Sequence, residues 1–347
     1  MSDEVLVVDD LSVHFKVSTG TKASKSVIKA VDGVSLTVGR GETLGIVGES
    51  GCGKSTTGYA IQGLVKRQGG SIRIGDTSLG KRLSSNRRLL SRRVQMVFQD
   101  PTSSLNSKMT VGQILAEPLT VHQIVPPRER TARVNELLEM VGMPITAAAR
   151  YPHEFSGGQR QRIGIARALA VEPELIICDE PTAALDVSVR AQVLNLLRRL
   201  QRERGLSFIF ISHDVSAVTY MADRIMVMYL GRAVEVLPRA SLLDGSAHPY
   251  TQALLSAVPF PDPVIEKSRE RILLRGDVPS PINPPSGCVF RTRCPMAQEI
   301  CATDVPQPRN IDDAAGSHIV ACHFAEEARE GGIPALAALN AMKETAA

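Results

Sequence analysis

The sequence contains no tryptophan and few other aromatic residues, with 8 Phe and 5 Tyr among 347 residues. Proteins that bind single-stranded nucleic acid stack the bases on aromatic side chains, so this scarcity argues against such a surface. Arginines cluster at positions 87, 88, 92 and 93, but a solvated helix face explains this run better than a phosphate track. The net charge of +4 is too small to indicate a partner. We therefore expect no nucleic-acid partner.

Long apolar runs are also absent. No stretch reaches the roughly 18 consecutive apolar residues that a membrane-spanning helix needs. The first residues, Met1 to Glu4, are acidic, unlike the basic and then apolar start of a signal peptide. With 43% apolar and 22% charged residues, the composition is that of a soluble globular protein of about two domains. We expect a cytoplasmic protein whose membrane association depends on a partner protein.

Residues 48–55 follow the apolar run 43–47 and fill the pattern glycine, four residues, glycine, lysine, serine. This pattern predicts a P-loop, whose glycines let backbone N–H groups converge on phosphate oxygens. Lys54 would add a positive charge near the β- and γ-phosphates, and Ser55 would offer a hydroxyl to Mg²⁺. A helix expected over residues 55–64 would direct its N-terminal dipole at the same anion. The chain is therefore predicted to bind a nucleoside triphosphate.

An acidic pair follows the apolar residues 175–178, and the segment Glu174 to Asp179 is typical of a buried parallel strand. Asp179 and Glu180 end this run, and ligands of open α/β sheets bind at such carboxyl ends. Asp179 is placed to hold Mg²⁺ through water, and Glu180 to act as general base on an attacking water. A helix N-cap is the plainer interpretation of the pair.

Four further positions complete the pattern. Gln99 follows the strand expected at 94–98, and His213 follows the strand expected at 207–211, where it could sense a γ-phosphate. The segment 155–159, Phe-Ser-Gly-Gly-Gln, precedes a helix that reaches Ala170, so its N-terminus could meet phosphate. Phe15 ends the first expected strand, where it could stack on adenine or belong to the core. A second strand is expected at 28–38, with a turn at Asp32-Gly33.

In this order, the motifs resemble the ATPase subunit of an ABC transporter. The resemblance implies that two such subunits enclose two ATP molecules, each bound by the Walker motifs of one chain and the signature of the other. Phe155 replaces the usual Leu of the signature, and Ala183 stands where Ser is common. The implied cofactor residues are Phe15, Gly48, Ser50, Gly51, Gly53, Lys54, Ser55, Thr56, Gln99, Ser156, Gly157, Gly158, Gln159, Asp179 and Asp186. The implied Mg²⁺ ligands are Ser55, Gln99 and Asp179, and the implied catalytic residues are Glu180 and His213.

A finer resemblance covers nearly the full length. The segments 98–106, 117–119 and 248–259 look like those of the oligopeptide and dipeptide importer ATPases, although Ser107 stands where that family often has Pro. This resemblance implies ATP-driven peptide import at the cytoplasmic face of the cell membrane. The implied partners are a second, homologous but distinct ATPase and two membrane-spanning permease subunits, with an extracytoplasmic solute-binding protein acting indirectly.

Other functions remain open within and beyond this subfamily. The same kind of subunit imports nickel or glycans. A soluble ABC ATPase acting on DNA or ribosomes would need a long coiled coil or two fused cassettes, and the sequence has neither. A degenerate, regulatory subunit of a heterodimer is the non-enzymatic alternative, and the intact Ser156, Glu180 and His213 count against it.

Four of the six cysteines, Cys288, Cys294, Cys301 and Cys322, lie in a Pro-rich C-terminal stretch. Their spacing suits four thiolates on one metal centre better than disulfides in a reducing compartment. The spacing fits zinc as well as iron–sulfur, and free buried thiols are the plainer alternative. The resemblance favours a [4Fe–4S] cluster. Cys52 and Cys178 are interpreted as structural.

We thus predict an α/β, P-loop ABC-type nucleotide-binding domain over residues 1–240. A helical subdomain at about 101–167 contains helices expected at 111–119 and 128–141. A small, irregular C-terminal domain with the four-cysteine cluster would occupy residues 241–347.

Overall fold

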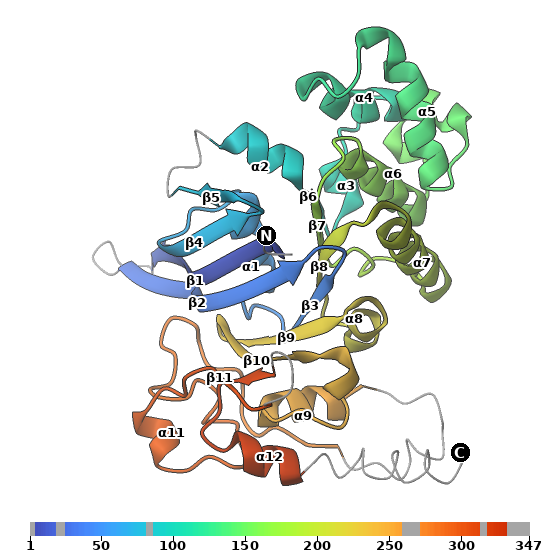
Figure 1. Cartoon of the computed structure of the whole chain (residues 1–347). Coiled ribbons are helices and arrows are strands. Elements are labelled where there is room, and N and C mark those ends of the chain that lie inside the picture. The colour runs from blue at the N-terminus through green and yellow to red at the C-terminus, as the bar shows by residue number, and fades with distance from the viewer. Residues whose placement is uncertain (1–3, 19–24, 81–85, 259–270, 313–317, 332–347) are drawn as a thin grey trace. The chain divides into compact units, whose positions relative to one another are not determined.

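The computed structural model describes residues 4–18, 25–80, 86–258, 271–312 and 318–331 (Figure 1). The chain divides into two compact units, each assembled from three separate chain segments. The first unit contains residues 1–9, 36–43 and 58–212, and the second contains residues 10–35, 44–57 and 213–347. The domain boundary expected near residue 240 stays a prediction.

Three adjacent parallel strands run through the first unit. β7 (Leu175–Asp179) lies between β6 (Val94–Val97) and β8 (Ser207–Ile211). Every residue of β7 and β8 is buried, as expected for parallel strands covered on both faces. The register pairs Asp179 with Ile211, so the acidic end of β7 lies beside the carboxyl end of β8. Helix α7 (Val187–Arg204) connects these two strands.

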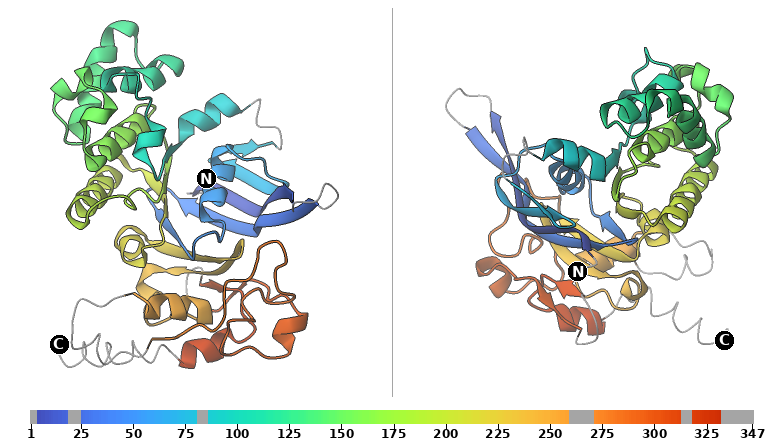
Figure 2. Two further views of the ribbon diagram at one scale, coloured as in Figure 1. Left: turned by 180° about the vertical axis from the view of Figure 1, so that it is seen from behind. Right: turned by 45° about the horizontal axis from the view of Figure 1, so that its top comes forward.

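Helices α4 (Val111–Val121), α5 (Arg130–Met140) and α6 (Gly157–Leu169) pack together in the first unit, and all views in Figures 1 and 2 show them as one group. They follow the short helix α3 (Pro101–Ser104). Leu115, Leu137 and Ile163 are fully buried among them. α5 begins two residues later than predicted, because Pro127–Glu129 forms a 3₁₀ turn first. Helix α2 (Arg87–Arg93) contains the arginine cluster, in which Arg93 pairs with Glu174 at 2.6 Å.

The second unit is built on the strand that leads into the P-loop. β3 (Thr43–Val47) pairs in parallel with β9 (Arg224–Tyr229), and β9 pairs antiparallel with β10 (Arg232–Pro238). Two short C-terminal strands, β12 (Ile319–Val320) and β11 (Arg309–Asn310), extend this sheet from β10. The described helices of this unit include α8 (Val215–Met221), α9 (Pro249–Ser256), α11 (Ile300–Thr303) and α12 (Ala325–Gly331).

A separate four-stranded sheet has the order β2-β1-β4-β5. Its strands are β1 (Glu4–Ser18), β2 (Lys25–Gly39), β4 (Gly69–Ile74) and β5 (Thr77–Leu79). The turn predicted at Asp32-Gly33 is wrong, because β2 continues through both residues. Gly33 has a φ of 77°, so the strand changes direction locally without ending.

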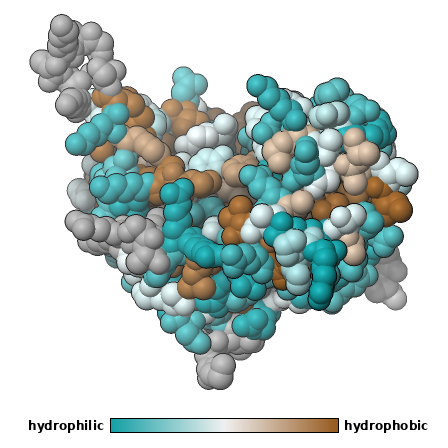
Figure 3. Space-filling model, turned by 90° about the horizontal axis from the view of Figure 1, so that it is seen from above, coloured by the Kyte–Doolittle hydropathy of each residue, from teal (hydrophilic) through white to brown (hydrophobic). Residues whose placement is uncertain are grey.

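Within the described part of the chain, no helix has the length and apolar character needed to cross a membrane. On the face drawn in Figure 3, hydrophobic residues lie in small patches among hydrophilic ones.

Candidate functional site

The P-loop lies in the second unit, between β3 and α1 (Lys54–Gln62). Gly48 and Gly53 have φ angles of 150° and 104°, a range that residues with side chains rarely adopt. A Cβ atom added to Gly48 would lie 2.2 Å from the carbonyl oxygen of Met228. One added to Gly53 would lie 2.2 Å from the carbonyl oxygen of Ala30. The close approach of two other chain segments therefore requires glycine at both positions.

Lys54 is only 5% exposed, and its ammonium group stays within the loop. Its Nζ donates hydrogen bonds to the carbonyl oxygens of Gly48 and Glu49 at 2.8 and 2.9 Å. These bonds hold a positive charge at the position that a P-loop offers to phosphate. The other predicted residues of the loop differ in exposure: Ser50 and Gly51 are exposed, whereas Ser55 and Thr56 are half-buried.

Glu49 connects the P-loop to the C-terminal third of the chain. Its backbone N–H donates to Tyr250 Oη at 2.9 Å. Its carboxylate accepts two hydrogen bonds from Arg293, at 2.8 and 3.0 Å. Arg293 also donates to Tyr229 Oη at 3.5 Å. The sequence analysis missed these contacts. Its one available signal was the segment 248–250, which was noted as a family feature without a role.

Phe15 and His213 also belong to the second unit. Phe15 lies on β1 and is 40% exposed, so it is not a core residue and its ring is accessible. His213 is exposed in the turn between β8 and α8. The next residue, Asp214, begins α8 by accepting hydrogen bonds from the N–H groups of Ser216 and Ala217.

The acidic pair of the first unit stands at the carboxyl end of β7, as predicted. Asp179 is 1% exposed, whereas Glu180 is half-buried. Glu180 has a φ of 46°, in the left-handed region that only a few non-glycine residues occupy. Its N–H nevertheless continues the sheet by donating to the Ile211 carbonyl at 2.9 Å. The chain therefore turns sharply at this residue while it remains tied to β8.

Two further side chains meet the acidic pair in the same unit. Gln99 Nε2 donates to Glu180 Oε2 at 3.3 Å, so the structure brings these two predicted residues together. Tyr59, on α1, hydrogen-bonds Asp179; burial raises the pKa of Tyr59 to about 12, and the Asp179 charge adds to the increase. The sequence analysis did not identify Tyr59, because a single tyrosine in a helix carries no motif.

The predicted signature forms the N-terminus of α6. Ser156 is the N-cap, and its hydroxyl accepts from the N–H of Gln159, whose side chain in turn accepts from the Ser156 N–H. Ser156, Gly157 and Gln159 are exposed, so their polar groups face solvent. Gly158 is buried, and an added Cβ would lie 2.2 Å from Val189 Cγ1.

The departure from the family pattern at Phe155 has a simple packing explanation. Phe155 is 4% exposed, and the Arg150 guanidinium lies 4.5 Å from the centre of its ring. The larger side chain is thus accommodated in the core beneath the signature. Asp186 is exposed at the start of α7, and its side chain makes no capping hydrogen bond there.

All four C-terminal cysteines are free thiols in the second unit. Cys288 and Cys301 are buried, and the N–H of Cys288 donates to the Cys301 carbonyl at 2.8 Å. Burial raises the pKa of Cys294 to about 11 and that of Cys322 to about 12, with smaller contributions from the other thiols. Among the described residues, no three His, Cys, Asp or Glu side chains gather closely enough to hold a metal ion. The predicted four-cysteine metal centre is therefore not evident from side-chain positions.

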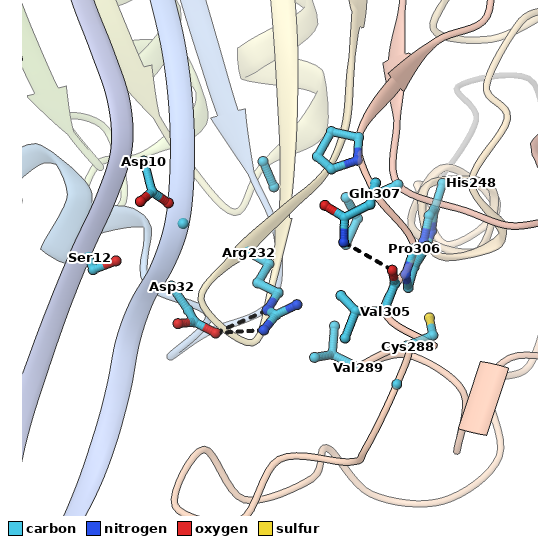
Figure 4. Close-up of a pocket in the computed structure, with 16 residues that line it drawn as sticks. Asp10, Ser12, Asp32, Arg232, His248, Cys288, Val289, Val305, Pro306 and Gln307 are labelled. Atoms are coloured by element: carbon cyan, nitrogen blue, oxygen red, sulfur yellow. Dashed lines mark hydrogen bonds and ion pairs between the residues drawn. The ribbon is translucent and has the colours of Figure 1, made fainter. Parts of the chain in front are cut away.

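A cavity of about 310 Å³ lies in the second unit beside Cys288 (Figure 4). Asp10 and Asp32 line it from the strands β1 and β2, and His248 lines it from the start of α9. Arg232 also lines it but is held by Asp32 through two hydrogen bonds of 2.7 and 3.1 Å. This arginine is thus already engaged, and the cavity is separate from the P-loop residues.

Comparison with known proteins now bears on these motifs. Residues 31–183 match the family model "ABC transporter", and residues 234–301 match "Oligopeptide/dipeptide transporter, C-terminal region". The chain is 52% identical over 323 residues to the oligopeptide transport ATP-binding protein OppF of Salmonella typhimurium, covering 92% of this chain and 95% of that one. It is 50% identical over 324 residues to AppF of Bacillus subtilis, covering 93% and 98%. The chain belongs to the oligopeptide transport ATP-binding proteins of the ABC transporter family.

Solved structures of ABC ATPases confirm the predicted α/β fold of this family member. The dimeric, post-hydrolysis structure of the ATP-binding cassette MJ0796, bound to ADP and Pi, matches with a TM-score of 0.60 and 28% identity. The matched region covers 67% of this chain and 98% of the MJ0796 chain. CbiO1 of Clostridium perfringens, part of the ABC transporter complex cbiONQ, also matches with a TM-score of 0.60, at 29% identity, covering 69% and 90%. The chain is therefore an ABC-type ATPase.

Proposed function

We propose that this chain hydrolyses ATP to power the import of peptides across the cell membrane, as the ATPase subunit of an ABC transporter. The observation that carries the proposal is the P-loop with its buried Lys54, in a chain about half identical over most of its length to oligopeptide transport ATP-binding proteins. Oligopeptides are the solutes named for those relatives. Nothing in an ATPase of this kind needs to touch the solute.

The P-loop supplies the binding half of the chemistry. Backbone N–H groups of residues 48–56 and the ammonium of Lys54 would bind the phosphates, and the accessible Phe15 ring would stack on adenine. Ser55, Gln99 and Asp179 offer oxygen donors, which suit the hard cation Mg²⁺. Bound Mg²⁺ would neutralise charge on the phosphates. Tyr59 would orient the Asp179 carboxylate through their hydrogen bond.

Glu180 supplies the base. Its carboxylate would accept the proton of the attacking water, and Gln99, 3.3 Å away, would hold that carboxylate in place. His213 would contact the γ-phosphate from the turn after β8. Hydrolysis of this kind depends on positioning and charge stabilisation, which a strained residue tied to a buried strand provides.

The remaining motifs support a site shared between two chains. Ser156 and Gln159 are exposed at a helix N-terminus, where they can reach a nucleotide held by another subunit. Asp186 is also exposed, at the start of α7. We propose a heterodimer with a second, homologous ATPase, bound to two membrane-spanning permease subunits at the cytoplasmic face of the membrane. A solute-binding protein would act from the other side.

Reconstitution with the membrane-spanning subunits in lipid vesicles tests this function. ATP on the side of the ATPase should drive the accumulation of a labelled oligopeptide, and Lys54→Ala should abolish it while the complex still assembles. Accumulation of nickel or a glycan in place of the peptide would contradict the proposed solute. Hydrolysis stimulated by DNA or ribosomes, without membrane subunits, would contradict the transport function.

We also propose that Cys288, Cys294, Cys301 and Cys322 hold a [4Fe–4S] cluster. In such a cluster each thiolate binds a different iron, so the four sulfurs need not approach as closely as they must around one zinc ion. Two observations support the fit: the four thiols lie near enough to influence one another's pKa, and Cys288 and Cys301 are buried while Cys294 and Cys322 are half-buried. Ligation would deprotonate these thiols and stabilise a region with few regular elements.

Elemental analysis of anaerobically purified protein tests the cluster. We expect about four irons per chain and a broad absorbance near 400 nm, both lost in Cys294→Ser. Cys178→Ser, which changes a buried cysteine of β7, serves as the control and should retain the iron. Stoichiometric zinc without iron would replace the cluster by a zinc site, and protein free of any metal would make the four cysteines ordinary buried thiols.

A further inference from the structure

Glu49 places a carboxylate inside the loop proposed to bind a triphosphate. Like charges repel strongly at short range, above all where little water screens them. The Glu49 side chain is 26% exposed, so it lies partly within the protein rather than extended into solvent. Unless this charge is directed elsewhere and neutralised, it opposes the phosphates that the loop must attract.

Arg293 meets both requirements. Its two terminal nitrogens each donate to a different oxygen of the Glu49 carboxylate, at 2.8 and 3.0 Å. This bidentate geometry fixes the direction of the carboxylate as well as balancing its charge. Tyr250 holds the same residue from a second side, since its hydroxyl accepts from the Glu49 N–H at 2.9 Å. Both partners thus come from the C-terminal third of the chain.

Neighbouring residues also hold Arg293 itself in place. Its side chain is 9% exposed, and its guanidinium carbon lies 5.9 Å from the centre of the Tyr229 ring. The rings of Tyr229, Tyr250 and Phe290 pack on one another with centroid distances of 4.7 to 5.3 Å. The Arg293 N–H donates to the Phe290 carbonyl at 3.0 Å. Backbone and side chain of Arg293 are therefore both anchored by contacts within the chain.

We propose that Arg293 is a positioning residue for the triphosphate site, which keeps the Glu49 carboxylate turned away from the bound phosphates. The proposal rests on the proposed role of the P-loop. It assigns a task in nucleotide binding to the segment that also contains Cys288 and Cys294. The ATP affinity of the loop then depends on residues that no nucleotide-binding motif contains.

Nucleotide titration of the purified full-length chain tests this role. Arg293→Gln should raise the ATP dissociation constant by about tenfold, because the charge of the Glu49 carboxylate is then no longer balanced and its direction is no longer fixed. Arg291→Gln is the matched control, since Arg291 lies two residues away and its side chain hydrogen-bonds Ser286, outside the P-loop. It should bind ATP as the wild type does.

A second background separates positioning from a merely structural role. In Glu49→Gln protein the charge is gone, so adding Arg293→Gln should change the ATP dissociation constant by less than about twofold. A purely structural arginine would lower thermal stability in both backgrounds and leave the ATP affinity of the folded protein unaltered. If Arg293→Gln does not fold, Arg293→Lys replaces it, and we expect several-fold weaker ATP binding from the loss of the bidentate contact.

The outcomes are distinct. The proposal would be overturned if Arg293→Gln, or Arg293→Lys where that is used instead, bound ATP as tightly as the control Arg291→Gln. It would also be overturned if Arg293→Gln weakened ATP binding as much in the Glu49→Gln background as in the wild type. Failure of the wild-type chain to bind ATP would instead contradict the proposed function of the loop.

Discussion

Glu180 combines a chemical role with a strained backbone. A non-glycine residue in the left-handed region costs about 1 to 2 kcal/mol, and such strain persists only where the surrounding structure imposes it. Here the bond from its N–H to Ile211 imposes it, together with the return bond from the Ala183 N–H to its own carbonyl at 3.2 Å. The strain thus marks the end of β7 as a place where the fold holds a carboxylate in a preset direction.

Glu180→Gln should retain ATP binding and lose hydrolysis by at least about 10²-fold, because an amide cannot take the proton of the attacking water. ATP should then accumulate in a stable dimer, detectable by size-exclusion chromatography with bound radiolabelled nucleotide. The matched control is Glu172→Gln, since Glu172 is another glutamate with a left-handed φ, of 54°, outside every ATP motif. Hydrolysis by Glu180→Gln within about twofold of the wild type would refute the assignment of the base.

For single residues, the sequence allowed prediction of those positions that belong to short local motifs. Lys54, Asp179 and Ser156 stand where the motifs placed them, because each motif is a short run whose backbone geometry its own residues determine. Glu49 and Arg293 are 244 positions apart, and no pattern in one chain alone links them. Their pairing depends on how β9, α9 and the cysteine segment fold together.

Helix α9 begins at a buried histidine whose protonation affects stability. Its N-cap is His248, whose Nδ1 accepts from the Tyr250 N–H at 3.1 Å. Burial lowers the pKa of His248 to about 4, although the nearby charge of Glu235 opposes the change. The cap is a neutral imidazole in the folded protein. Tyr250, which contacts the P-loop, lies on this helix. Protonation of His248 would therefore disturb the helix that holds Tyr250 in place.

The sign of the pH effect follows from this lowered pKa. Below about pH 6.5 the unfolded chain takes up a proton on His248 that the folded chain excludes until about pH 4, so stability falls across that window by up to about 3 kcal/mol. Above it, the contribution is fully present. His248→Asn keeps a capping oxygen and should flatten this part of the stability profile, measured by urea unfolding at neutral pH and at about pH 5. His153→Asn, at an exposed histidine, should keep the wild-type slope.

Elements with continuous patterns were predictable, and elements with local exceptions were not. β7 is an uninterrupted apolar run, and its observed bounds agree with the prediction to within one residue at each end. β2 contains Asp32-Gly33, a pair typical of turns, yet Arg232 bonds Asp32 and the strand continues. A tertiary contact therefore overrides the turn preference, which is the kind of information that periodicity lacks.

For the whole molecule, the exposed signature implies that one chain does not contain a complete site. Ser156→Arg should abolish hydrolysis in the assembled complex while the isolated chain binds ATP nearly as well as the wild type, since this serine would serve the partner's nucleotide. Isothermal titration of the isolated chain and turnover by the complex measure the two properties. Loss of ATP binding by the isolated chain would contradict the shared site.

Thr110→Arg provides the matched control for that experiment. Thr110 is the N-cap of α4 and forms the same kind of capping box, with Gln113, in a helix without an ATP motif. Both substitutions should therefore cost a similar stability, about 1 kcal/mol. Only Ser156→Arg should abolish turnover.

The parallel pairing of β3 with β9 has a consequence for biosynthesis. Val47, at the entrance to the P-loop, pairs with Val227, about 180 residues later in the chain. At translation rates of roughly 5 to 20 residues per second, the strand that leads into the P-loop waits about 10 to 35 seconds on the ribosome for this neighbour. During that interval an apolar strand with an open edge can pair with the wrong chain. Slower synthesis over this interval should therefore lower the fraction of newly made protein that reaches its native state. A chaperone that binds the exposed strand should raise that fraction.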